Sequence, residues 1–243
     1  MKKLSLLLPF LFSLLKTALP QDEIKISPDI VLKQLTENSY LSVSYGNIPG
    51  YGRVASNELI FINNNEAVLF NTPINDSLTK TLVTWLSDKM GLRIKMFVAN
   101  HWHDDCIGGL NYIHSLKIKS YASRLTIDIA KAKGKPVPQN GFNDSLKLKL
   151  GDKEILCYYP GAAHSLDNIV VWIPSENLLF PGCMCKSIDS RDPGNTADGD
   201  LNEYPKTIEK VISKFGSAKI VVPGHGAPGG PELLVHTLSL FKK

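Results

Sequence analysis

Five consecutive residues near the middle of the chain bring together two histidines and two aspartates, close behind a short apolar run. Residues 94–99, with the sequence IKMFVA, are typical of a buried strand. His101, His103 and Asp105 follow at alternate positions, and alternate side chains of an extended chain point the same way. Imidazole nitrogen and carboxylate oxygen are both zinc ligands. Because the whole chain has only six histidines, this clustering favours a metal site at a strand end over an incidental polar loop.

Three further segments contain a histidine or a cysteine among glycine and other small residues, next to a predicted strand. Small neighbours let the backbone approach a metal closely, and loops at strand ends often carry functional residues. The candidate ligands are His164 before the strand 169–173, Cys183 after the strand 178–180, and His225 after the strand 219–222. Each is a weak signal alone, and His164 could equally be a polar core residue. Together with residues 101–105 they supply four histidines, one carboxylate and one thiolate, enough for two metal ions.

Hydrophobic periodicity predicts short strands and amphipathic helices around these segments. The expected strands are 59–62, 67–70, 94–99, one near Ser120, 154–159, 169–173, 178–180 and 219–222, and the expected helices are 76–90, 106–114, 123–133, 201–215 and one from Pro231. A hairpin-rich first half and a second half of strands and helices predict an α/β fold, the four-layer αβ/βα sandwich with sheets inside and helices outside. No linker divides residues 21–243, so we expect a single domain.

The first 20 residues carry Lys2 and Lys3, followed by an apolar run over residues 4–15. This layout is typical of a secretory signal and is short for a bilayer span. Lys16 interrupts the run and no clear cleavage motif follows, so a disordered apolar leader is the alternative. We expect export to the periplasm and a mature form without membrane contact. Removing residues 1–20 lowers the net charge from +4 to +1, which makes nucleic acid a poor candidate partner.

Four cysteines, Cys106, Cys157, Cys183 and Cys185, could form two disulfides in an oxidising compartment. A chain of 243 residues does not need such cross-links to be stable, however. Cys106 and Cys183 also lie in the segments rich in metal-ligand residues. We therefore expect the thiols to remain unpaired, with Cys183 available as a thiolate ligand.

The segments HWHDDCIGGL, GAAHSLDNIVVW, LLFPGCM and VVPGHG resemble the metallo-β-lactamases of class B, in particular their broad-spectrum two-zinc group, subclass 1. The resemblance runs from about Asn38 to the end of the chain. It implies the metallo-β-lactamase fold and zinc-dependent hydrolysis of the β-lactam ring of penicillins, cephalosporins and carbapenems, which confers antibiotic resistance. The implied partner is a small-molecule β-lactam, and the implied enzyme is a monomer.

The resemblance also assigns ligands by position. His101, His103 and His164 match the ligands of the first zinc, and Asp105, Cys183 and His225 match those of the second. Cys106 stands where the wider superfamily, including thioesterases and RNA-processing nucleases, usually has histidine. His101 stands where the narrow carbapenem-specific branch has asparagine.

Three features match the substrate site of that family. Lys186 corresponds to the cation that binds the substrate carboxylate, Asn195 to an asparagine that helps polarise the lactam carbonyl, and residues 45–53 to a mobile flap. Without the resemblance they would be a surface lysine, a turn asparagine and a flexible hairpin. The implied catalytic residues are Asp105, which orients the attacking hydroxide, and Asn195.

Two positions depart from the family pattern. Asn71 stands where aspartate is usual, at the end of the strand 67–70, and such outer residues can change metal affinity roughly 10- to 100-fold. We expect Asn71 near Asp105 or Cys183 and the second zinc to bind more weakly. Cys185 replaces a usual apolar residue and is expected to act as a small buried hydrophobe.

Two other functions remain as alternatives. One is an exported hydrolase of the same fold acting on another ester, thioester or lactone, for which the departure at Asn71 leaves room. The other is an exported zinc-binding or zinc-sequestering protein, which would not need a flap or an open coordination position. Lys186, Asn195 and the cysteine at 106 favour the β-lactam hydrolase.

Overall fold

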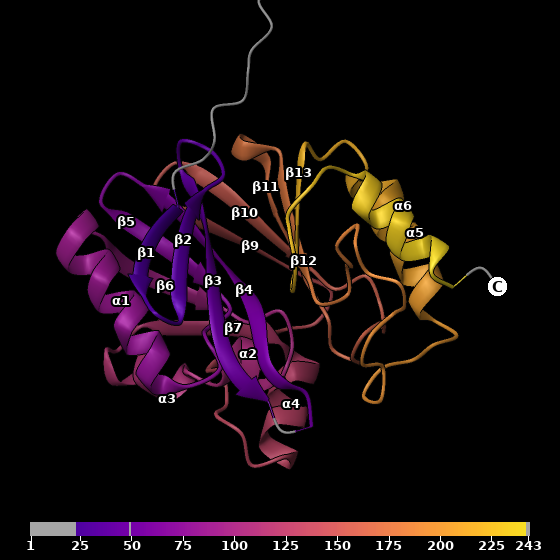
Figure 1. Cartoon of the computed structure of the whole chain (residues 1–243), viewed down its shortest axis with the longest axis horizontal. Helices are drawn as coiled ribbons and strands as arrows, with labels where there is room; N and C mark the ends of the chain where they lie inside the picture. The colour runs from indigo at the N-terminus through magenta and orange to yellow at the C-terminus, as the bar shows by residue number, and fades with distance from the viewer. Residues whose placement is uncertain (1–22, 49, 242–243) are drawn as a thin grey trace, which may run out of the picture.

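A computed structural model describes residues 23–48 and 50–241, so the predicted signal segment lies outside the described residues. Two β-sheets face each other at the centre of the molecule (Figure 1). In spatial order, the first sheet contains β1 (Glu23–Ser27), β2 (Ile30–Gln34), β3 (Ser39–Ile48), β4 (Gly52–Asn63), β5 (Glu66–Phe70), β6 (Arg93–Val98), β7 (Lys119–Ser123) and β8 (Asn140–Phe142). The second contains β13 (Ile220–Pro223), β12 (Leu178–Gly182), β11 (Val170–Ile173), β10 (Lys153–Tyr158) and β9 (Ser145–Leu150).

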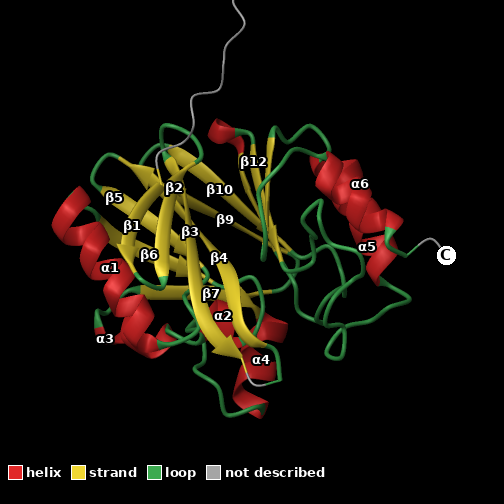
Figure 2. Ribbon diagram, viewed as in Figure 1, coloured by secondary structure: helices red, strands yellow, loops and turns green. Residues whose placement is uncertain are grey.

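Helices cover the outer sides of both sheets (Figure 2). Helices α1 (Asp76–Met90) and α3 (Leu110–Ser115) lie against the first sheet, and α5 (Tyr204–Phe215) and α6 (Glu232–Ser239) lie against the second. The shorter elements are α2 (Asp104–Ile107), α4 (Arg124–Ala132) and the 3-10 turn Pro174–Glu176. This arrangement confirms the predicted four-layer sandwich. No helix in the described part of the chain is long and apolar enough to cross a bilayer.

Apolar side chains fill the three spaces between the four layers. Phe61, Phe70, Ile155 and Phe180 belong to the central cluster, between the two sheets, and each is fully buried. Separate clusters lie under α1 and α3 on one side and under α5 and α6 on the other. Because each strand alternates its side chains between two faces, residues of one sheet contribute to two of these clusters.

The predicted helix 76–90 is confirmed with the same bounds as α1, and its end signals act as expected. The side chain of Asn75 accepts a hydrogen bond from the backbone N–H of Leu78 at 2.9 Å, which caps the first turn. Gly91 ends the helix with φ of 65°, a left-handed conformation that glycine adopts without steric cost.

The helix predicted over 106–114 is two short helices, α2 and α3, separated by Gly108 and Gly109. Both glycines lie in close contact with the start of α1. A Cβ atom at Gly109 would lie 1.8 Å from the hydroxyl oxygen of Thr79, and one at Gly108 would lie 2.1 Å from the carbonyl oxygen of Ile74. The break therefore lets the chain turn beneath α1, and the short α2 carries Asp105.

Other boundaries also differ from the predictions. The helix predicted from Leu201 begins at Tyr204, because residues 201–203 form a turn with Pro205 in the first helical positions. Strands β1, β2, β8 and β9 were not predicted, and only the end of β3 falls within the predicted hairpin 45–53. β1 is an edge strand with mostly exposed side chains, which gives little hydrophobic pattern, whereas the Leu–Lys alternation of β9 was a usable signal.

The two sheets are joined near the carboxyl ends of β6, β12 and β13. Asn57 of β4 is buried, and its side-chain amide donates hydrogen bonds to the carbonyl oxygens of Pro223 at 2.8 Å and Gly226 at 2.9 Å. Its backbone N–H donates to the carbonyl oxygen of Gly224 at 2.9 Å. These three bonds fix the loop after β13 against the first sheet.

We predict that Asn57→Ala lowers the free energy of unfolding by about 1–3 kcal/mol, because the buried carbonyl group of Pro223 and the partly buried one of Gly226 lose their donor. Urea unfolding followed by fluorescence would measure this change. Asn47→Ala, at an exposed position of the neighbouring strand β3, serves as the matched control and should change stability by less than about 0.5 kcal/mol. Equal stability of the two variants would contradict this role of Asn57.

Candidate metal centre

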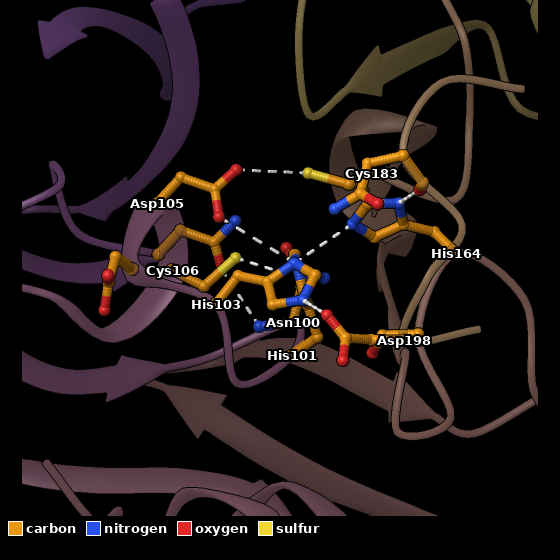
Figure 3. Close-up of polar contacts among 12 residues, drawn as sticks. Asn100, His101, His103, Asp105, Cys106, His164, Cys183 and Asp198 are labelled. Carbon is orange, nitrogen blue, oxygen red and sulfur yellow. Dashed lines mark hydrogen bonds and ion pairs between the residues drawn. The ribbon is translucent and has the colours of Figure 1, made fainter. Parts of the chain in front are cut away.

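Three predicted histidine ligands meet in one cluster, although they come from different layers. His101 and His103 follow β6, and His164 lies in the loop between β10 and β11. The Nδ1 atom of His103 lies 2.9 Å from Nε2 of His101 and 3.2 Å from Nε2 of His164. A tetrahedral zinc ion separates its nitrogen ligands by about 3.4 Å, because zinc–nitrogen bonds measure about 2.0–2.1 Å. The spacing of the three nitrogens therefore fits one metal ion (Figure 3).

The other ring nitrogen of each histidine has its own partner. His103 Nε2 lies 3.0 Å from a carboxylate oxygen of Asp198, and His101 Nδ1 lies 3.1 Å from the sulfur of Cys106. His164 Nδ1 lies 2.7 Å from the backbone carbonyl oxygen of Asn195. Such partners fix the ring orientation and leave the facing nitrogen free for a metal.

Burial favours the neutral form of His101 and His164. Burial, with the neighbouring His103, lowers the pKa of His101 to about 3. Burial likewise holds the pKa of His164 well below its usual range. Neutral imidazole is the form that binds metal.

The remaining three predicted ligands form a second cluster next to the first. The Cys183 sulfur lies 3.4 Å from Asp105 Oδ2 and 3.4 Å from His225 Nε2, and the last two atoms are 3.2 Å apart. His225 Nδ1 lies 2.7 Å from the backbone carbonyl oxygen of Ala55. Asp105 Oδ1 lies 3.9 Å from Nε2 of His101, so the carboxylate of Asp105 borders both clusters.

The charges of the second cluster suit a metal cation. Burial works to raise the pKa of Asp105, but the hydrogen bond with His225 and the nearby histidines outweigh it and hold this pKa below its usual range. The neighbouring Cys106 thiol lowers the pKa of Cys183 to about 6, which favours the thiolate. Burial raises the pKa of Cys106 well above its usual range, so Cys106 stays protonated.

All four cysteines are unpaired and at most 2% exposed, as predicted. Cys157 lies between the sheets and Cys185 lies under α6, and burial raises the pKa of each to about 12. Cys185 therefore has the character of a small buried hydrophobe, although its sulfur also lies 3.7 Å from the Thr237 hydroxyl.

A cavity of about 630 Å³ opens above both clusters. His103, Asp105, His164 and His225 contribute to its floor, and Lys186 and Asn195 also line it. Its remaining wall includes Ile48, Tyr51 and Val54 from the hairpin of β3 and β4 that was predicted as a flap. Tyr51 is 63% exposed, so this wall is open to solvent.

Lys186 and Asn195 both have anchored positions on the cavity wall. Lys186 Nζ donates a hydrogen bond to the carbonyl oxygen of Cys183 at 2.9 Å, and burial lowers the pKa of this lysine. The side-chain oxygen of Asn195 accepts a hydrogen bond from the backbone of Ala197 at 3.1 Å. Lys186 is therefore not the solvated surface lysine that its sequence context alone allows.

Asn71 has a different partner from the one expected. Its side-chain oxygen accepts a hydrogen bond from the backbone N–H of Asn100 at 2.9 Å, and among the described residues no hydrogen bond joins it to Asp105 or Cys183. Its φ of 61° is left-handed, a conformation that asparagine tolerates better than most residues. Asn71 therefore fixes the backbone directly before His101.

Several residues of the site could not be identified from sequence. Asp198 orients His103 from 95 positions away, and the carbonyl groups of Ala55 and Asn195 orient His225 and His164. No local pattern marks an acidic loop residue or a backbone carbonyl as a partner of a distant ring. Asn57 lies in the polar run Ser56–Asn57–Glu58 just before the predicted strand 59–62, and nothing in that run marks it as a partner of a distant loop.

Fold and site together define a metal-binding hydrolase with an αβ/βα scaffold. The chain is similar to a metallo-β-lactamase type 2 of Bacteroides fragilis, with 48% identity over all of this chain and 97% of the relative. It is 37% identical to one from Bacillus cereus, over 88% of this chain and 83% of the relative. A solved metallo-β-lactamase from Pontibacter korlensis superposes with a TM-score of 0.84 at 33% identity, covering 88% and 99% of the two chains. No protein-family profile matches the chain.

The chain therefore belongs to the metallo-β-lactamases.

The role of Cys183 can be tested directly. We predict that Cys183→Ser keeps the fold but loses most of the metal bound by the second cluster, because a hydroxyl does not ionise as the thiol does. Metal content measured by mass spectrometry, with circular dichroism as the check on folding, would show this. Cys157→Ala removes a buried thiol between the sheets and should leave metal content unchanged. A disulfide between any two cysteines of the metal-loaded protein would contradict the assignment.

Proposed function

We propose that this protein hydrolyses the β-lactam ring of penicillins, cephalosporins and carbapenems at a centre of two zinc ions, and so confers antibiotic resistance. The main support is that two different ligand clusters border one open cavity together with a partly buried lysine. Relatives named as β-lactamases, matched over most of their length, add independent support.

The donor atoms support zinc at both clusters. His101, His103 and His164 would hold the first ion, and Asp105, Cys183 and His225 the second. Neutral imidazole, carboxylate and thiolate are the usual zinc donors, and a three-ligand site keeps a position open for water or substrate. When bound, the ions supply a Lewis acid for the lactam carbonyl and lower the pKa of water toward neutrality.

The protein's own residues orient the reactants. Asp105 borders both clusters, so its carboxylate can accept a hydrogen bond from the attacking water and hold it toward the lactam carbonyl. Lys186 attracts the carboxylate that β-lactams carry next to the ring nitrogen. The side-chain oxygen of Asn195 already accepts a hydrogen bond from Ala197. The side-chain N–H group of Asn195 is therefore free to donate to the lactam carbonyl oxygen. Such preorganised donors stabilise developing charge.

The open wall of the cavity favours an enzymatic function over a function in metal storage. Ile48, Tyr51 and Val54 present apolar surface beside the two clusters, and a protein that only sequesters zinc has no use for it. The related proteins compared above carry β-lactamase names, which gives no support to an ester, thioester or lactone substrate.

We also propose that residues 1–20 direct export to the periplasm and that residues 21–243 act there as a monomer. The two lysines and the apolar run of the first 20 residues support export.

Metal dependence is the first test of this function. Purified protein should contain close to two zinc ions per chain, and hydrolysis of a carbapenem and of a cephalosporin should stop after treatment with a chelator. Added zinc should restore both activities, because the ions supply the Lewis acid. Hydrolysis that continues after complete removal of metal would refute the proposal.

Lys186→Ala provides a second test. We predict that KM rises about tenfold for carboxylate-bearing lactams, because a hydrogen bond between charged groups is worth at least ~1.5 kcal/mol. The value of kcat should change less, since the contact exists before and in the transition state. Lys147→Ala, an exposed lysine of β9 away from the cavity, is the control. Identical kinetics of the two variants would remove Lys186 from the substrate site.

A further inference from the structure

Glu58 is a fully buried carboxyl group in the strand that supports the metal centre. It lies on β4, directly opposite Ser42 of β3 in the register of the sheet. Its two oxygens accept one hydrogen bond each, from the hydroxyls of Ser42 and Ser44, both at 2.5 Å. Two hydroxyl donors, one on each oxygen, are well suited to a carboxylate.

Glu58 has no ion-pair partner in the described part of the chain. Among the ion pairs of the described residues, none includes Glu58. Burying a charge without a partner is costly, and burial raises the pKa of Glu58 to about 8. The charged or titratable groups within electrostatic reach are Asp105, which repels the carboxylate, and His225, which attracts it. Both belong to the second cluster.

The same strand also holds His225 in place through its backbone. The carbonyl of Ala55 contacts the His225 ring. Asn57, the neighbour of Glu58, donates hydrogen bonds to Pro223 and Gly226, which flank His225 in the loop. In the antiparallel pairing of β4 with β5, Leu59 lies opposite Phe70. Glu58 precedes Leu59 and Asn71 follows Phe70, so these two positions lie beside each other. A carboxyl group is thus present next to the position where the family resemblance led us to expect one.

We propose that Glu58 is a positioning residue of the metal centre, and that its buried carboxylate is the counter-charge that favours a metal ion at Asp105, Cys183 and His225. This inference rests on the proposed ligand set of that cluster. Without the metal, Glu58 holds a proton at neutral pH. The positive ion that binds nearby stabilises the carboxylate, and the proton leaves to solvent. The two serine hydroxyls then both donate to the charged group.

Glu58→Gln tests this role while keeping size and hydrogen-bonding capacity. Competition titration with a zinc chelator should show about tenfold weaker binding at the second site, the usual size of an effect from beyond the ligands. The first site should keep its affinity. Glu66→Gln, an acidic residue on the neighbouring strand β5 that pairs with Arg93 and Lys95, is the matched control and should leave both affinities unchanged. Unchanged second-site affinity in folded Glu58→Gln would overturn the proposal.

A measurement on the unmodified protein decides the question even if that variant does not fold. Infrared difference spectra on filling the second site with zinc should show the loss of a protonated carboxylic acid band at pH 7. Persistence of that band, or its absence before zinc is added, would overturn the proposal. Neither readout depends on hydrolysis, so a protein that binds two zinc ions but leaves β-lactams intact would refute the proposed function and leave the role of Glu58 standing.

Discussion

The two sheets must meet in one fixed register, because each ligand cluster takes side chains from both halves of the sandwich. A shift of either sheet would separate His164 from His103, and Cys183 and His225 from Asp105, whose facing atoms now lie 3.2–3.4 Å apart. Buried asparagines maintain this register. Asn57 bonds the first sheet to the loop after β13, and Asn100 donates to the carbonyl oxygen of Ile169, directly before β11 of the second sheet, at 3.0 Å. Polar groups at this junction therefore fix the register of the two sheets, which non-directional apolar packing alone would not specify.

Electrostatics divides the centre into two different halves. Burial lowers the pKa of His101 and His164 in the first cluster, whereas the second cluster gathers a carboxylate and a thiolate of lowered pKa. Burial works to lower the pKa of His225, but Cys183 and Asp105 outweigh it and hold this pKa well above its usual range, so one ring cation faces two buried negative charges in the metal-free protein. The uncompensated charge destabilises the metal-free fold, and a divalent ion removes that penalty. Metal binding and folding stability are therefore coupled most strongly at the cysteine side of the centre.

Sequence alone predicted the layers and the six candidate ligands because both leave local patterns. Alternate positions after a strand marked His101 and His103, and small residues marked the loops of His164 and Cys183. What it missed depends on distant contacts. The break in the predicted helix reflects the packing of Gly109 against Thr79 of α1, and the side chain of Asn71 accepts a hydrogen bond from the backbone of Asn100, one strand away. A buried acid such as Glu58 is likewise invisible in a strand pattern, since its partners are serines on β3.

The burial of the thiols has a consequence for how the chain reaches its active form, given the export that we propose. In the finished fold the four sulfur-bearing side chains are at most 2% exposed, so oxidants have almost no access to them. A newly exported, unfolded chain has no such protection, and thiol–disulfide exchange depends on access to the thiolate. Whether Cys183 remains reduced then depends on two rates, the rate at which the two sheets fold around it and the rate at which the unfolded chain forms disulfides. Fast folding would be as important to this centre as the affinity of its ligands.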